Sequence, residues 1–136
     1  MTASTLGQLI DRHGIDVLDH LDRQLEVPVL DGLQFQGDLA VIPLERKMTG
    51  AWRPVPPEGV PVIEAVGSGH EHRLLASEDG TASLLAGFGG QDIGYLETTE
   101  AAYLAHPEHG YLGIAPGSYV LRRQREQADE ERLVAD

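Results

Sequence analysis

Residues 93–122 read IGYLETTEAAYLAHPEHGYLGIAPGSYVLR and contain four short runs of β-branched, aromatic and small apolar residues. Glycine, proline or charged residues separate the runs, which is typical of β-strands joined by turns. The same pattern of short apolar runs separated by turn residues begins after Val27-Pro28, and the whole chain holds 16 glycines and 8 prolines. Eight runs are predicted to be strands: Leu39–Leu44, Val60–Val66, Arg73–Ala76, Ala82–Ala86, Ile93–Thr98, Ala101–Ala105, Gly110–Ile114 and Ser118–Arg122.

The N-terminal residues 5–25 carry apolar side chains at helical spacing instead. Thr5 and Gln8 have the spacing of a capping box, and Gly14 suits a left-handed helix end. Asp16 is placed to cap a second short helix, so we expect two short helices or one kinked helix. No strand–helix alternation follows residue 28, which argues against a parallel sheet. The sequence predicts an α+β, mostly β fold: a short N-terminal helical element plus an antiparallel β-barrel or β-sandwich of about seven or eight strands.

The length of 136 residues predicts one domain over 1–136, with a β-rich core at 28–124 and a tail at 125–136. Residues 45–61 hold four prolines and the only tryptophan, and are expected to form a long surface loop or arm. Trp52 in this loop either covers an edge of the core or is an exposed anchor for a partner. The tail is expected to be a short helix or a frayed end.

The composition excludes several classes of function. With 22 acidic and 10 basic residues the formal net charge is −12, which argues against duplex DNA or an anionic membrane as partner. There is no cysteine, which excludes disulfides, a thiol nucleophile and thiolate zinc sites. No apolar run approaches the roughly 18 residues that a membrane-spanning helix needs. The first residues also lack the basic segment followed by an apolar segment that marks a secretory signal peptide, so we expect a soluble, cytoplasmic protein.

Four of the six histidines lie in residues 67–110, where seven acids face one base. On a strand, His70 and His72 would share a face because side chains alternate. Pro107 favours a type I turn that would bring His106 and His109 together. If the two pairs converge, they form a site for a divalent transition metal such as Zn, Fe, Ni, Cu or Mn. The other interpretation is that these histidines are isolated or structural. The candidate carboxylate ligands or acid/base groups are Glu78 and Glu108.

The histidine pattern has a partial resemblance to the cupins, small β-barrels that hold a metal with three His and one Glu. Here Ala115-Pro116-Gly117 is similar to the cupin Pro-x-Gly turn, although no histidine follows it. A second resemblance is to small uncharacterised bacterial and phage proteins. It covers roughly the last half of the chain and rests on His70 or His72, His106, His109, Gly110, Pro116, Gly117, Tyr119, Arg122 to Glu126 and Val134 to Asp136. It implies that the histidines and the arginine string form one module.

The arginine string Arg122, Arg123 and Arg125 is a candidate anion or partner-binding element, because guanidinium groups grip carboxylates and phosphates. Its competing role is pairing with carboxylates of the same chain. Our leading hypothesis is a non-catalytic binding or accessory module that presents the histidine hairpins and the arginine string. The partner would be a protein or a second copy of the chain, with a local RNA or anion contact through the arginines. The alternative is a small metal-dependent enzyme using the four histidines with Glu78 or Glu108.

Overall fold

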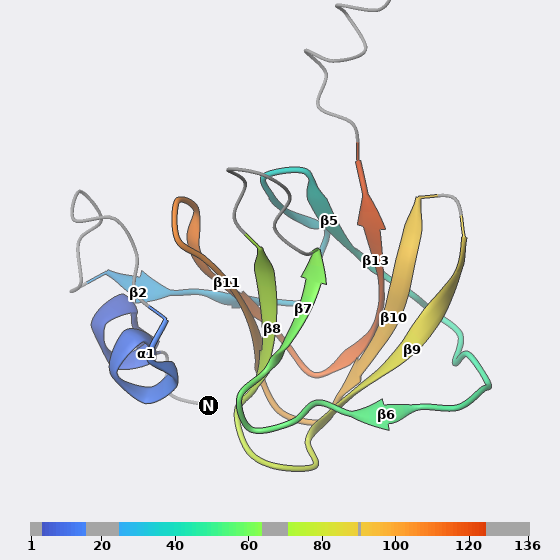
Figure 1. Cartoon of the computed structure of the whole chain (residues 1–136), viewed down its shortest axis with the longest axis horizontal. Helices are drawn as coiled ribbons and strands as arrows, with labels where there is room; N and C mark the ends of the chain where they lie inside the picture. The colour runs from blue at the N-terminus through green and yellow to red at the C-terminus, as the bar shows by residue number, and fades with distance from the viewer. Residues whose placement is uncertain (1–3, 16–24, 64–70, 90, 125–136) are drawn as a thin grey trace, which may run out of the picture.

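The computed structural model describes residues 4–15, 25–63, 71–89 and 91–124, and these build two β-sheets packed face to face (Figure 1). The larger sheet has six strands in the order β4 (Gln34–Gln36), β5 (Leu39–Pro43), β13 (Gly117–Arg123), β10 (Asp92–Thr98), β9 (Ala82–Gly89) and β6 (Arg53–Pro54). The smaller sheet has five in the order β3 (Val29–Leu30), β12 (Gly110–Ile114), β11 (Ala102–His106), β8 (His72–Ala76) and β7 (Val60–Ile63). A separate two-stranded pair joins β1 (Ser4–Thr5) to β2 (Glu26–Val27).

The predicted α+β, mostly β fold is confirmed, and of the two architectures it is the sandwich. The eight predicted strands are present, although Val60–Val66 is described only as far as Ile63. Five strands of two or three residues were not predicted: β1, β2, β3, β4 and β6. The pairing is antiparallel except where β3 lies parallel to β12, with Gly113 opposite Val29. Within the described residues, no helix is long and apolar enough to cross a membrane.

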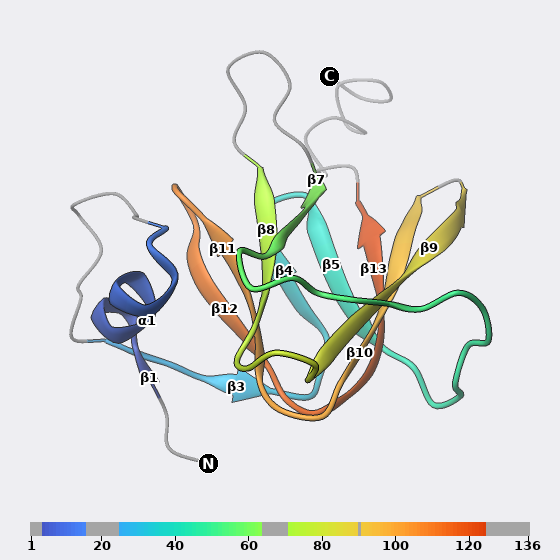
Figure 2. The ribbon, with the colours of Figure 1, turned by 60° about the horizontal axis from the view of Figure 1, so that its bottom comes forward.

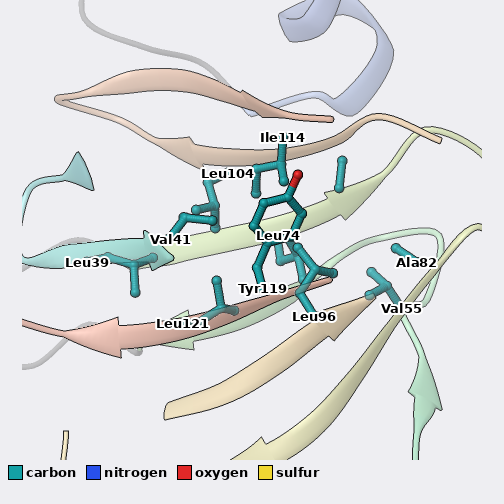
Figure 3. Packing of buried hydrophobic residues seen from close by; sticks show 11 residues of the cluster. Leu39, Val41, Val55, Leu74, Ala82, Leu96, Leu104, Ile114, Tyr119 and Leu121 are labelled. Atoms are coloured by element: carbon teal, nitrogen blue, oxygen red, sulfur yellow. The ribbon is translucent and has the colours of Figure 1, made fainter. Parts of the chain in front are cut away.

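The main core fills the space between the two sheets (Figure 3). Side chains alternate along a strand, so each strand sends every second residue into this space. Leu96 and Leu121 enter from the larger sheet and Leu74 and Leu104 from the smaller one, each with no exposed surface. The Tyr119 hydroxyl, also in this cluster, donates to the carbonyl of Ala115 at 2.7 Å. The interdigitated apolar layer holds the two sheets together.

Both outer sheet faces are also partly covered. Helix α1 (Leu6–His13) packs on the smaller sheet (Figure 2). There Leu9 joins a second buried cluster with Tyr103 and Tyr111. The predicted helix ends are confirmed. Thr5 and Gln8 form a capping box, and Gly14 ends the helix with a left-handed φ of 74°. The second helix expected after Asp16 falls outside the described residues.

The predicted proline-rich arm, residues 45–61, runs from the larger sheet to the smaller one and contains β6. Trp52 is partly buried in a third cluster, formed by Leu85, Tyr95 and Val120 on the outer face of the larger sheet. Its indole N–H donates to the carbonyl of Met48 at 3.0 Å. Trp52 therefore packs against that cluster and covers part of it.

His13, the last residue of α1, is expected to make folding weaker in acid. Its ring centroid lies 6.2 Å from those of Tyr103 and Tyr111, and its buried Nε2 has no hydrogen-bond partner in the described chain. Burial first, and then the charge of Arg12, lower the pKa of His13 below 6.5. A histidine with a depressed pKa stabilises the fold fully above about pH 6.5, and this stability is lost as the pH falls through the folded-state pKa.

The substitution His13→Phe should therefore raise the free energy of unfolding by about 1 kcal/mol at pH 8, because it removes an unpaired buried nitrogen. The gain should be larger at pH 5. At that pH the histidine of the unfolded chain takes up a proton more readily than the buried His13 of the folded chain, which lowers the stability of the unmodified protein. Urea unfolding of both proteins at the two pH values measures this. Other titrating groups are present in both proteins and cancel in the difference. An equal gain at both pH values would contradict the burial argument.

Candidate functional site

Three of the four predicted histidines meet at one end of the smaller sheet. His72 begins β8, His106 ends the neighbouring β11, and His109 lies in the turn that leads into β12. The ring centroid of His106 is 4.5 Å from that of His72 and 4.5 Å from that of His109. The His72 and His109 rings lie 6.4 Å apart and nearly parallel, at 8°. Strand pairing of β8 with β11 and the β11–β12 hairpin bring these histidines together.

A buried glutamine, Gln36, determines which ring nitrogen of His72 carries the proton. The Gln36 side-chain amide donates to two backbone carbonyls, those of Leu104 and Gly110, both at 3.0 Å. Its Oε1 is thereby turned toward His72, and lies 2.9 Å from Nδ1. Because this oxygen only accepts, His72 Nδ1 must carry a proton and donate it. In the neutral imidazole the lone pair therefore belongs to Nε2.

That second nitrogen of His72 faces a carboxylate. Asp38 Oδ1 lies 3.2 Å from Nε2, and the Asp38 carbonyl is held in turn by the Gln124 N–H at 2.7 Å. Burial is the largest influence on His72 and lowers its pKa below 6.5. Asp38 raises the pKa in opposition, while His109 and Arg123 lower it further. In the neutral state, two electron-pair donors thus face each other across 3.2 Å.

His106 organises the hairpin turn. Its Nδ1 accepts the backbone N–H groups of Glu108 at 3.1 Å and His109 at 3.2 Å, so the neutral ring carries its proton on Nε2. Gly37, with a φ of 60°, lies next to the rings of His109 and His72. A Cβ on this residue would come within 2.9 Å of His109 Nε2 and 3.4 Å of His72 Cε1. Only glycine lets the β4–β5 turn approach the two imidazoles this closely.

The site opens to solvent beside His109. This side chain is exposed, whereas His72 and His106 are 2% and 6% exposed. A cleft of about 340 Å³ runs past His109, Gln36 and Gly37 toward Phe35 and Tyr111. A small ion or a side chain of another molecule can therefore reach the His109 imidazole from this cleft. Among the described residues, no group of three or more His, Asp or Glu side chains is already arranged to hold a metal ion.

The remaining predicted site residues are distributed more widely. Glu108 is exposed in the hairpin turn beside His109, while Glu78 lies in the turn after the opposite end of β8. Arg122 Nε pairs with Asp92 Oδ1 at 2.6 Å, as the internal alternative for the arginine string expects. Arg123 is exposed and close enough to lower the pKa of His72. His70 and Arg125 lie outside the described residues.

Sequence reasoning missed Gln36 and Asp38, the two residues that surround His72. The local signal was Gly37-Asp38, a dipeptide typical of a two-residue hairpin turn between strands. Gln36 itself carries no such signal, because a polar residue in a three-residue strand reads as a solvent-facing position. Its 4% exposure results from packing against β11 and β12, which lie 68 to 74 residues further along the chain.

The fold and the site together define a β-sandwich domain with a histidine–carboxylate site at one end of a sheet. Residues 35–124 match the family model described as Domain of unknown function (DUF8820), and the chain belongs to this family. The matched region spans β4 to β13 and so includes Gln36, Asp38 and the three described histidines of the site. Comparison with the curated proteins and with the solved structures found no match.

Proposed function

We propose that the protein is a non-catalytic binding module whose histidine site takes a divalent transition-metal ion, with His72 and Asp38 as its first two ligands. The observation that carries this proposal is the 3.2 Å separation of His72 Nε2 from Asp38 Oδ1. Two facing electron-pair donors repel each other unless a cation lies between them. Either a proton or a metal ion can fill that position.

The surroundings of His72 favour the metal ion near neutral pH. Burial lowers the pKa of the imidazole, so the proton is given up readily. With bonds of about 2.0–2.2 Å to nitrogen and oxygen, neighbouring ligands of a tetrahedral ion lie about 3.3–3.6 Å apart, so the observed 3.2 Å is close to the lower end of that range. Gln36 accepts the Nδ1–H of His72, and a partner of this kind orients a metal-binding histidine.

His109 is a candidate for a third ligand because its exposed side chain lines the open cleft, 6.4 Å from the His72 ring between centroids. His70, two residues before His72, and His106 are the other nitrogen donors, and Glu108 is a second carboxylate. Three histidines and one carboxylate are also the ligands of the cupins, the family with the partial resemblance described above. Imidazole and carboxylate together suit Zn, Fe, Ni, Cu or Mn.

Zinc titration of the metal-stripped protein by calorimetry tests the proposal. The unmodified chain should bind one Zn²⁺, and His72→Ala and Asp38→Asn should each weaken binding by at least about tenfold. Asp38 is partly exposed, so Asp38→Asn should keep the fold even if the buried His72 variant does not. The visible spectrum of the Co²⁺-loaded protein should change in both variants, because it reports the ligands directly.

The matched control is His13→Ala, which removes a histidine from the other side of the smaller sheet and should leave zinc binding unchanged. The same titration of His70→Ala, His106→Ala and His109→Ala assigns the remaining ligands. The proposal is wrong if the unmodified chain takes up no zinc, or if Asp38→Asn binds it as tightly. The closing sequence signature, the cytoplasmic location and the bacterial or phage origin stay predictions from the sequence. So does the partner expected at Arg122, Arg123, Arg125 and Trp52.

A further inference from the structure

A cavity of about 650 Å³ lies at the opposite edge of the sandwich from the β3 and β4 edge strands. Its walls are the edge strands β6 and β7, the arm that joins them, and the inner parts of β9, β10 and β13. Leu121, which has no exposed surface, lies at its inner end, so the cavity reaches the main core. Pockets of about 300–1,000 Å³ with mostly apolar walls are the usual size for small-molecule sites.

The apolar walls of the cavity are an incompletely filled part of the core. Val60, Val62, Leu84 and Ile93 all pack against the inter-sheet cluster but stay only partly buried. Two irregular features lie along this edge. The register of β10 against both neighbouring strands shifts between Asp92 and Gly94, and prolines at 54, 56 and 61 stiffen the arm and β7. Apolar surface left at such an edge favours an apolar occupant.

One cation, Arg53, lines this cavity, and because its side chain is exposed we place it at the opening. The Cα of Arg53 pairs directly with that of Leu84 across β6 and β9. Directly opposed residues of an antiparallel pair share a sheet face, so Arg53 leaves the backbone on the same side as the core-facing Leu84. In the described part of the chain Arg53 makes no ion pair, although the protein carries twelve surplus negative charges.

From the apolar walls and the guanidinium at the mouth, we propose that this cavity binds a single-chain amphiphile with a carboxylate head group, such as a medium-chain fatty acid. The alkyl chain lies between the sheets against Val62, Leu84 and Ile93. The carboxylate lies at the opening and accepts the paired N–H groups of Arg53, the geometry that a guanidinium fork favours. This site is separate from the histidine site and does not depend on the function proposed there.

Calorimetric titration with decanoate and with the uncharged decanol tests both parts of the proposal. The unmodified protein should bind one decanoate, and more tightly than decanol. Arg53→Gln should weaken decanoate binding by at least about tenfold and leave decanol binding unchanged, because it removes only the charge-assisted contact. Val62→Trp should abolish binding of both by filling the cavity.

Arg46→Gln is the matched control, since Arg46 is exposed in the same arm but does not line the cavity. It should bind decanoate as the unmodified protein does. Circular dichroism confirms that each variant is folded, and Arg53→Gln tests the proposal even if Val62→Trp does not fold. The proposal is overturned if decanoate does not bind, if Arg53→Gln binds it equally well, or if decanol binds as tightly as decanoate.

Discussion

The substitution Leu104→Ala is expected to lower the free energy of unfolding by about 3 kcal/mol, among the largest losses from any single side chain. Leu104 has no exposed surface and lies on β11, with Leu74 and Leu112 as its Cα partners on the two neighbouring strands. Truncation removes apolar contacts and leaves a cavity between the sheets, where the close-packed neighbours relax only in part.

Urea unfolding followed by circular dichroism measures this change. Leu33→Ala is the control, since Leu33 is 56% exposed and its truncation should change stability by less than about 0.5 kcal/mol. The Leu104 carbonyl that accepts from Gln36 is unaffected by truncation of the side chain. A loss below about 1 kcal/mol for Leu104→Ala would show that the two sheets do not pack as described.

The substitution Gln36→Leu is expected to cost about 3 kcal/mol as well, for a different reason. It removes three hydrogen bonds at a position that is 4% exposed: those to the carbonyls of Leu104 and Gly110 and the one from His72 Nδ1. Polar groups left unpaired in the interior cost about 1–3 kcal/mol each, partly offset here by the added apolar side chain. The loss should be seen in the same urea experiment.

Gln34→Leu provides the matched control two residues away. Gln34 is only partly buried, and its amide donates to the carbonyl of Gly113 at 2.8 Å, with a longer contact of 3.4 Å to that of Leu30. Its loss should cost about 1 kcal/mol. Gln36→Leu should also weaken zinc binding about 10–100-fold, because nothing then holds the His72 proton on Nδ1. Equal effects of the two substitutions would refute the role given to Gln36.

The local sequence pattern was sufficient to predict the longer strands and the ends of the helix. The apolar runs after Pro28 are bounded by turn residues, and every one of them forms a strand. The Thr5 and Gln8 spacing places the helix start, because a capping box needs only residues three apart. Strands of two residues such as β3 and β6 carry no periodicity of their own and exist only because a neighbouring strand pairs with them.

The sequence indicated that the histidines form a site, but it did not indicate which side chains surround them. His106 and His109 lie on one hairpin, so their proximity follows from Pro107 and the turn. The approach of His72 depends on β8 pairing with β11, about thirty residues further along the chain. Asp38 reaches the site from the larger sheet, and no spacing rule connects it with His72.

By itself, the sequence determined the strand-rich class, the capped first helix, the formal net charge of −12 and the residue types from which a metal site can be built. These depend on contacts between near neighbours in the chain, which periodicity and turn chemistry record. Only the tertiary structure decided that the strands form a sandwich, that Gln36 and Asp38 face opposite nitrogens of His72, and that Arg53 stands at the mouth of an apolar cavity. Those arrangements depend on pairing and packing between distant segments, and the free energy that selects them comes from the buried core as a whole.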